Sequence, residues 1–157
     1  MICAKLIIYN MKKILPYCYS IVLIILMSSG VIAQTPKYEI GDKAHGGIIA
    51  WITKDGKHGL VCSESNIDKF NWEDAKKKCS ELELGGKDDW YLPSEGEMHI
   101  LHENLYIKGL GGFTADIVCW SNRKYSKTDA FLFNFLYGYA YNTSKDSIYS
   151  IRAVRAF

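Results

Sequence analysis

The stretch GGIIAWITKDGKHGLVC, residues 46–62, contains two short apolar runs on either side of a turn signal. The runs cover residues 48–52 and 58–62, and the segment between them contains Asp55-Gly56. Short apolar runs that flank Asp-Gly are typical of a β-hairpin, because the glycine accepts the backbone angles that a tight turn requires. We therefore predict that a hairpin opens the folded part of the chain.

Two helices are predicted after this hairpin. Asn71 has the position of an N-cap, and a stripe of apolar residues follows it at helical spacing: Trp72, Ala75, Cys79 and Leu82. Gly85-Gly86 is expected to end this helix. Ser94 and Glu97 have the spacing of a capping box, which predicts the start of a second helix.

The remainder of the chain is typical of β-strands. Residues 130–136 alternate in the manner of a strand, Tyr137-Gly138 predicts a turn or a bulge, and residues 148–157 form a predicted last strand. A hairpin, two helices and C-terminal antiparallel strands give an α+β fold.

The N-terminal segment predicts export. Lys12 and Lys13 precede an apolar run that ends at small residues, and cleavage is expected after Ala33. Residues 1–33 are thus a predicted signal peptide, with either Met1 or Met11 as the start, and residues 34–157 a single domain. The mature protein is expected to be periplasmic, cell-surface or extracellular, with membrane contact only through the signal peptide before cleavage.

Charge and cysteine content limit the possible partners. Loss of Lys5, Lys12 and Lys13 lowers the basic residues from 19 to 16 against 17 acidic ones, so the formal charge changes from +2 to −1. No nucleic-acid partner is expected from such a balance. Three cysteines remain, Cys62, Cys79 and Cys119, and they allow one disulfide of unspecified pairing.

Several blocks of residues resemble the Lcl C-terminal domain family, named for a bacterial collagen-like surface adhesin. They are residues 46–52 with 58–61, Gly85-Gly86, residues 89–94 (DWYLPS), Trp120-Ser121, and residues 152–157 (RAVRAF). The resemblance covers nearly all of residues 40–157. The chain departs from the family pattern at residues 117–122, and it lacks the collagen-like stalk.

The resemblance implies a C-type-lectin-like fold and, from the eponymous adhesin, binding of sulfated glycans at a cell surface, often as a trimer. Formylglycine-generating enzymes share that fold and use a copper-binding cysteine pair, which Cys62, Cys79 and Cys119 do not match. We therefore expect a non-catalytic module without cofactor or metal. Glu95, His99 and His102, which share a predicted helix face, are expected to be structural or solvated.

The candidate residues fall into two groups. A structural role is expected for Trp51 and for most of the family motif, namely Gly46, Gly47, Asp89, Trp90, Leu92, Pro93, Ser94, Trp120 and Arg152. The ligand-binding candidates are Tyr137, Tyr139 and Tyr141, which share a face if their strand is regular, together with Lys124, Lys127 and Arg155.

Alternatives remain open for these candidates. The tyrosines form either a binding surface or a covered sheet face. One arginine of the last strand either pairs with a buried or half-buried carboxylate or contributes to an anion site. The expected function is a surface module for polysaccharide or sulfated glycan, with an extracellular glycan or surface protein as partner. The alternatives are a structural domain for protein interaction, including homo-oligomers, and an enzyme related to formylglycine-generating enzymes.

Overall fold

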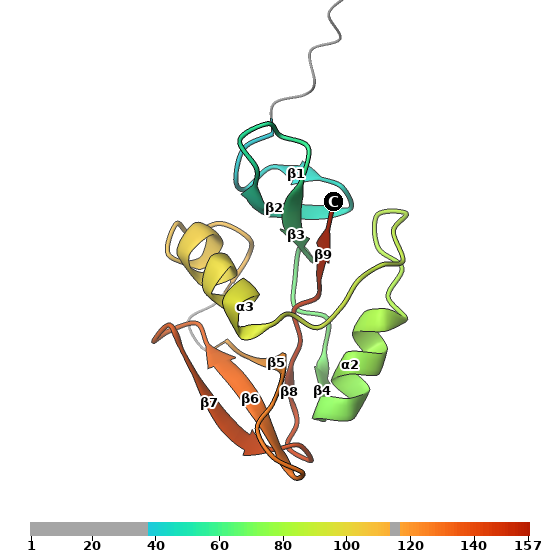
Figure 1. Cartoon of the computed structure of the whole chain (residues 1–157), viewed down its shortest axis with the longest axis vertical. Coiled ribbons are helices and arrows are strands. Elements are labelled where there is room, and N and C mark those ends of the chain that lie inside the picture. The colour runs from blue at the N-terminus through green and yellow to red at the C-terminus, as the bar shows by residue number, and fades with distance from the viewer. Residues whose placement is uncertain (1–37, 114–116) are drawn as a thin grey trace, which may run out of the picture. The chain divides into compact units, whose positions relative to one another are not determined.

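A computed structural model describes residues 38–113 and 117–157 (Figure 1). The predicted signal peptide, residues 1–33, lies outside the described residues, and so do both possible starts. Residues 36–157 form one compact unit, to which all the elements below belong. In the described ranges, no helix is long and apolar enough to cross a membrane.

The first sheet contains the predicted hairpin. Its order is β1-β2-β3-β9, with β1 at Lys43–Ala44, β2 at Gly47–Ile52, β3 at Gly59–Cys62 and β9 at Val154–Ala156. All its neighbours are antiparallel. The register of β2 on β3 shifts between Ile49 and Trp51, and this bulge leaves Ala50 buried and Trp51 43% exposed. The prediction of Trp51 as a core residue is therefore wrong.

The second sheet contains the C-terminal strands. Its order is β4-β8-β5-β6-β7, with β4 at Lys69–Phe70, β8 at Tyr149–Ser150, β5 at Val118–Lys124, β6 at Asp129–Asn134 and β7 at Tyr139–Ser144. Strands β6 and β7 form an antiparallel hairpin around Gly138, whose φ of 69° fits the predicted turn. The predicted α+β class is confirmed, with its hairpin, helices and C-terminal strands in that order. The C-terminal strands are antiparallel except for β8, which pairs with β5 in parallel.

The predicted last strand, residues 148–157, is two strands in the structure. Strand β8 belongs to the second sheet and β9 to the first, and the buried residues 151–153 connect them. The backbone of this connection bonds to the segment after β3, since Ser63 N–H donates to Ala153 O and Ile67 N–H to Ile151 O. Residues 148–157 therefore do not form one continuous strand, because the connection between β8 and β9 bonds to the segment after β3 and belongs to neither sheet.

The first helix, α2, covers Trp72–Ser80 and has the predicted N-cap, with the side chain of Asn71 accepting from Asp74 N–H at 2.9 Å. It ends before the predicted Gly85-Gly86. Leu84 and Lys87 instead exchange two backbone hydrogen bonds, of 3.0 and 3.2 Å, across those two glycines. Both glycines have positive φ, so they form a tight turn that lies beyond the helix.

The second helix, α3, covers Glu95–Leu101 and has the predicted capping box of Ser94 and Glu97. A short π-helix, η1, continues it over His102–Tyr106. Met98, Leu101 and Leu105 are fully buried on its inner side.

The two helices cover opposite faces of the second sheet (Figure 1). On the α3 side, Met98 and Leu101 pack with Cys119 and Phe133. On the α2 side, a second cluster contains Trp72, Ala75, Cys79, Trp120, Leu132 and Ile151. Strands β5 and β6 are therefore apolar on both faces, as expected of strands covered from both sides.

The three described cysteines are buried free thiols. Burial raises the pKa of Cys79 and of Cys119 to about 12. These side chains therefore serve as small apolar core residues.

Candidate functional site

Tyr137, Tyr139 and Tyr141 form a continuous series of aromatic rings, which we call the tyrosine row. The ring centroids of Tyr137 and Tyr139 are 5.9 Å apart, and those of Tyr139 and Tyr141 are 6.0 Å apart. Tyr137 is 67% exposed and Tyr139 52% exposed. The alternation in the sequence thus places these side chains together, and two of them present most of their surface to solvent.

The row is anchored at one end and free at the other. Tyr141 lies opposite Leu132 of β6 and packs against the core on the α2 side of the sheet. At the other end, Asn134 Oδ1 accepts the backbone N–H groups of Leu136 and Tyr137, at 2.9 and 3.3 Å. These bonds fix the turn that presents Tyr137, so the exposed rings are held on a rigid hairpin.

Tyr149 lies near the anchored end of the row. Its ring meets Trp120 edge-on, with centroids 5.5 Å apart. Burial, together with the neighbouring phenols of Tyr149 and Tyr139, raises the pKa of Tyr141. The phenol of Tyr141 therefore stays protonated and able to donate a hydrogen bond at neutral pH.

Four lysines belong to segments that meet at the C-terminal end of β7, and we call them the lysine cluster: Lys76, Lys124, Lys127 and Lys145. Lys145 Nζ donates to Lys127 O at 3.0 Å and lies 4.6 Å from the centre of the Trp72 ring. Lys76 Nζ lies 3.9 Å from the same ring and 2.7 Å from the Glu73 carboxylate. The pKa of Glu73 is lowered chiefly by its hydrogen bond to Lys76, with smaller effects of Lys145 and Lys124.

The tyrosine row lies on the same side of the second sheet as two members of the lysine cluster, Lys76 and Lys145, which both contact the Trp72 ring. Tyr141 and Trp72 belong to the same core cluster. Lys145 follows Tyr139 by six residue steps along the chain, which is about 20 Å at the rise of a β-strand. A chain-like ligand along β7 would meet aromatic rings at one end and ammonium groups at the other.

The sequence predicts Lys124 and Lys127 at this surface but misses Lys76 and Lys145. Lys145 continues the odd-numbered face of β7, and that alternation is the signal which would have found it. Arg123 is close in sequence but points elsewhere, since it pairs with Glu95 of α3 and lies 4.3 Å from the Phe131 ring.

Arg155 does not belong to this surface, and its expected role in ligand binding is corrected. It lies on β9 in the first sheet and is only 7% exposed. Its guanidinium donates to Asp89 through Nε at 2.5 Å and Nη2 at 2.9 Å, and Nη1 donates to His45 O at 3.1 Å. Of the two interpretations open for the arginines, pairing with a carboxylate holds for Arg155, but the Asp89 side chain is 54% exposed and is therefore not a buried partner.

This ion pair makes stability dependent on pH. The hydrogen bonds from Arg155 hold the pKa of Asp89 below its ordinary value. The pair therefore contributes above the unfolded-state pKa of about 3.9, and the contribution is lost as the pH falls through the lower folded-state pKa. Because solvent screens the exposed Asp89 carboxylate, we expect Asp89→Asn to lower the free energy of unfolding by only about 1 kcal/mol at neutral pH and to flatten its fall in acid.

Urea denaturation at several pH values measures this effect. Asp88→Asn is the matched control, because Asp88 is an exposed neighbour that makes no ion pair with a described residue. Equal acid dependence of Asp89→Asn and the wild type would contradict the assigned role.

Arg152, the other arginine of the predicted last strand, is completely buried. It donates to Gly111 O, to Glu64 O at 3.3 Å and to Asn66 Oδ1 at 3.3 Å, and its guanidinium lies 4.1 Å from the Phe113 ring. No described carboxylate forms a salt bridge with it. Its acceptors come from two separate segments, residues 64–66 and Gly111, so Arg152 joins both of them to the connection between β8 and β9.

The remaining motif residues also lie in the core or at element ends. Trp90, Leu92 and Trp120 are at most 3% exposed. Trp120 Nε1 donates to Phe70 O at 2.8 Å, and Pro93 O accepts from Asn122 N–H at 2.7 Å. Ser94 caps α3. Gly46 lies against the Leu84–Gly85 turn, and Gly47 lies against Cys62 O of β3 and the Trp90 ring.

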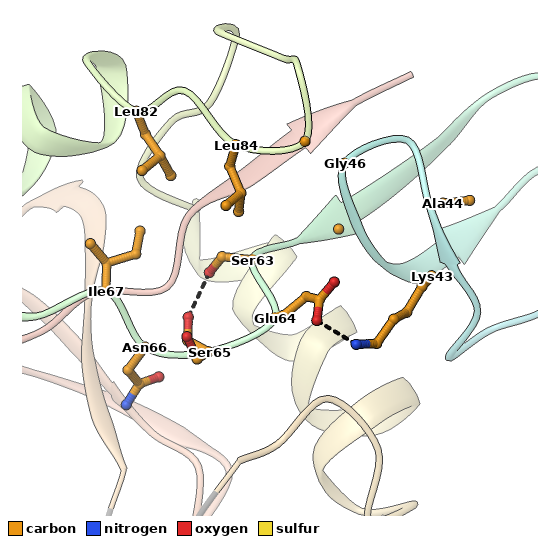
Figure 2. Close-up of a pocket in the computed structure, with 12 residues that line it drawn as sticks. Lys43, Ala44, Gly46, Ser63, Glu64, Ser65, Asn66, Ile67, Leu82 and Leu84 are labelled. Carbon is orange, nitrogen blue, oxygen red and sulfur yellow. Dashed lines mark hydrogen bonds and ion pairs between the residues drawn. The ribbon is translucent and has the colours of Figure 1, made fainter.

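A separate cleft of about 770 Å³ lies between the β1–β2 turn, the segment after β3 and the loop after α2 (Figure 2). Ile67, Leu82 and Leu84 give it an apolar side, and the ion pair of Lys43 and Glu64, at 2.5 Å, stands across from them. Sequence reasoning misses this cleft because its lining comes from segments far apart in the chain. Its charged side chains already neutralise each other.

The described residues contain no group of three or more His, Cys, Asp or Glu side chains placed to hold a metal ion. The side chains of the candidate surface are phenols and ammonium groups. These groups bind ligands by hydrogen bonds, aromatic contact and charge.

Comparison with known families identifies the domain. Residues 51–155 match the model of the Lcl C-terminal domain family. The chain belongs to this family. The matched range of this Lcl C-terminal domain includes the tyrosine row and the lysine cluster.

The chain was also compared with individual solved structures and curated sequences. The crystal structure of botrocetin, a C-type-lectin-like protein, is similar to this Lcl C-terminal domain with a TM-score of 0.44 and 11% sequence identity. The alignment covers 73% of this chain and 98% of botrocetin. No curated protein sequence matches the chain.

Proposed function

We propose that this Lcl C-terminal domain is an exported, non-catalytic binding module that recognises an extracellular polysaccharide along β7. The observation that carries the proposal is the tyrosine row, in which Tyr137 and Tyr139 are mostly exposed yet held in contact with each other. Tyrosine combines a large apolar ring with a hydroxyl, and few rotatable bonds are frozen when it binds.

The even spacing of the rings suits a ligand that repeats. Neighbouring rings follow each other at about 6 Å from the β6–β7 turn into β7. The rings therefore offer a succession of apolar edges and hydroxyls, which matches the alternating apolar and hydroxylated surfaces of a sugar chain. The lysine cluster would contact acidic or sulfate substituents at the far end of the ligand.

The predicted signal peptide, residues 1–33, supports the extracellular setting of this proposal. Membership of the Lcl C-terminal domain family supports a binding role. The fixed hairpin supports the same role, because a preformed surface loses little conformational entropy when a ligand binds.

Retention on immobilised heparin tests whether the lysine cluster contributes to ligand binding. The full chain is expressed with its export segment in a bacterial host, and the processed protein is eluted from heparin with a salt gradient. We expect Lys124→Gln/Lys127→Gln to elute at clearly lower salt than the wild type, because two of the four clustered charges are removed.

The matched control is Lys54→Gln/Lys57→Gln, which removes the same charge from the exposed turn between β2 and β3. It should elute close to the wild type. Equal shifts in the eluting salt concentration for both double variants would show that retention depends only on net charge. Flow-through of the wild type at low salt would exclude a sulfated ligand.

A further inference from the structure

Strand β7 is the outer strand of the second sheet, and it differs from the other outer strands. It has six residues, from Tyr139 to Ser144, and pairs with β6 in one unbroken register. The other outer strands, β1, β4 and β9, have only two or three residues, and each contains a lysine or an arginine. Short strands and charged side chains are the usual means by which proteins protect sheet edges from pairing.

Strand β7 lacks these protections. Its sequence, YAYNTS, contains no charged residue and no proline, and its pairing with β6 contains no bulge. Tyr139, Asn142 and Ser144 are exposed along it. In the described part of the chain no strand pairs with its outer edge. A long, flat and uncharged edge is a template for a further strand.

The strand is compatible with a second copy of itself. In an antiparallel pair, residues directly opposite each other point to the same face of the sheet. A two-fold axis at Tyr141 therefore sets Tyr141 opposite its own equivalent and Tyr139 opposite Thr143 of the second copy. The tyrosine rows of both copies then lie on one face, where cross-strand aromatic pairs stabilise a sheet.

Charge also permits this self-association. No two like charges meet within the paired residues, because Lys145 and Asp146 follow the end of the strand. The predicted mature chain, with a formal charge of −1, repels a second copy only weakly.

We propose that two copies of the domain associate through antiparallel pairing of their β7 strands about a two-fold axis at Tyr141. The two five-stranded sheets then form one continuous sheet. The two tyrosine rows meet at its centre, with a lysine cluster at either side. This association goes beyond polysaccharide binding and does not require it, since the contacts are made by the strand edge.

Sedimentation velocity of the processed wild-type protein and two lysine variants tests the association. Asn142→Lys places a charge on the exposed edge of β7, opposite Ala140 of the second copy. Asn122→Lys is the matched control, because Asn122 is also exposed but lies on the interior strand β5. Circular dichroism establishes that both variants are folded.

We expect the wild type and Asn122→Lys to sediment as dimers, and Asn142→Lys to raise the dimer dissociation constant by about tenfold or more. A monomeric wild type would overturn the proposal. The partner of the β7 edge would then be an extended segment of another protein. A dimer that Asn142→Lys leaves intact would overturn it as well, because the contact would then lie on another surface.

Discussion

Replacing Arg152 by alanine is expected to lower the free energy of unfolding by about 3–5 kcal/mol. The side chain is completely buried and donates to Gly111 O, Glu64 O and Asn66 Oδ1. Its removal leaves these acceptors without their donors and opens a cavity beside Phe113. Part of the loss is offset because the cost of burying the guanidinium charge disappears.

Two further variants separate hydrogen bonding from volume and charge. Arg152→Met fills much of the space, and Arg152→Lys keeps the charge, but neither presents the planar fork of donors that reaches three acceptors. Both should remain well below the wild type in urea denaturation. Arg123→Met, which removes a surface arginine, should cost less than about 1 kcal/mol. Near wild-type stability of Arg152→Met would refute the role given to the hydrogen bonds.

A methyl group added at Gly47 is expected to destabilise the domain by about 3 kcal/mol or more. A Cβ atom there would lie 2.3 Å from Cys62 O and 3.0 Å from the Trp90 ring. The first contact is with backbone inside the β2–β3 pair, which moves only if the hairpin register is disturbed. Gly47→Ala should therefore give a lower unfolding midpoint and a lower yield of folded protein.

Gly96→Ala is the control with the opposite expected sign. Gly96 lies in α3, and a Cβ atom there meets nothing within 4 Å. Alanine is favoured over glycine inside a helix by about 0.5–1 kcal/mol. A thermal unfolding series should place Gly96→Ala above the wild type and Gly47→Ala well below it. The reverse order would be inconsistent with this packing of the hairpin.

The elements predicted correctly are those specified by nearby residues. Asp55-Gly56 marks the hairpin turn, and the side chains of Asn71 and Ser94 cap the helices that follow them. The errors depend on contacts between distant segments. The bulge that exposes Trp51 forms against β3, and the division of the last strand depends on hydrogen bonds to residues 63–68.

In the candidate surface too, the features specified by nearby residues are predicted, and those that depend on distant contacts are not. The tyrosine row follows from alternation along one strand, so the sequence predicts it. Arg155 alternates equally well, but its carboxylate partner, Asp89, is 66 residues away in the chain. Lys76 and Lys145 come together only because both pack against the Trp72 ring. Spacing along the chain contains no information about such contacts.

Retention of the processed protein on immobilised polysaccharides, neutral and sulfated, tests the binding role of the tyrosine row most directly. We expect retention on at least one of them, lost in Tyr137→Ala/Tyr139→Ala and kept in Tyr125→Ala. Tyr125 is the matched control, since it is 61% exposed but packs on Phe131, away from the row. Unchanged retention of the double variant, or no retention of the wild type on any polysaccharide, would contradict the proposed function.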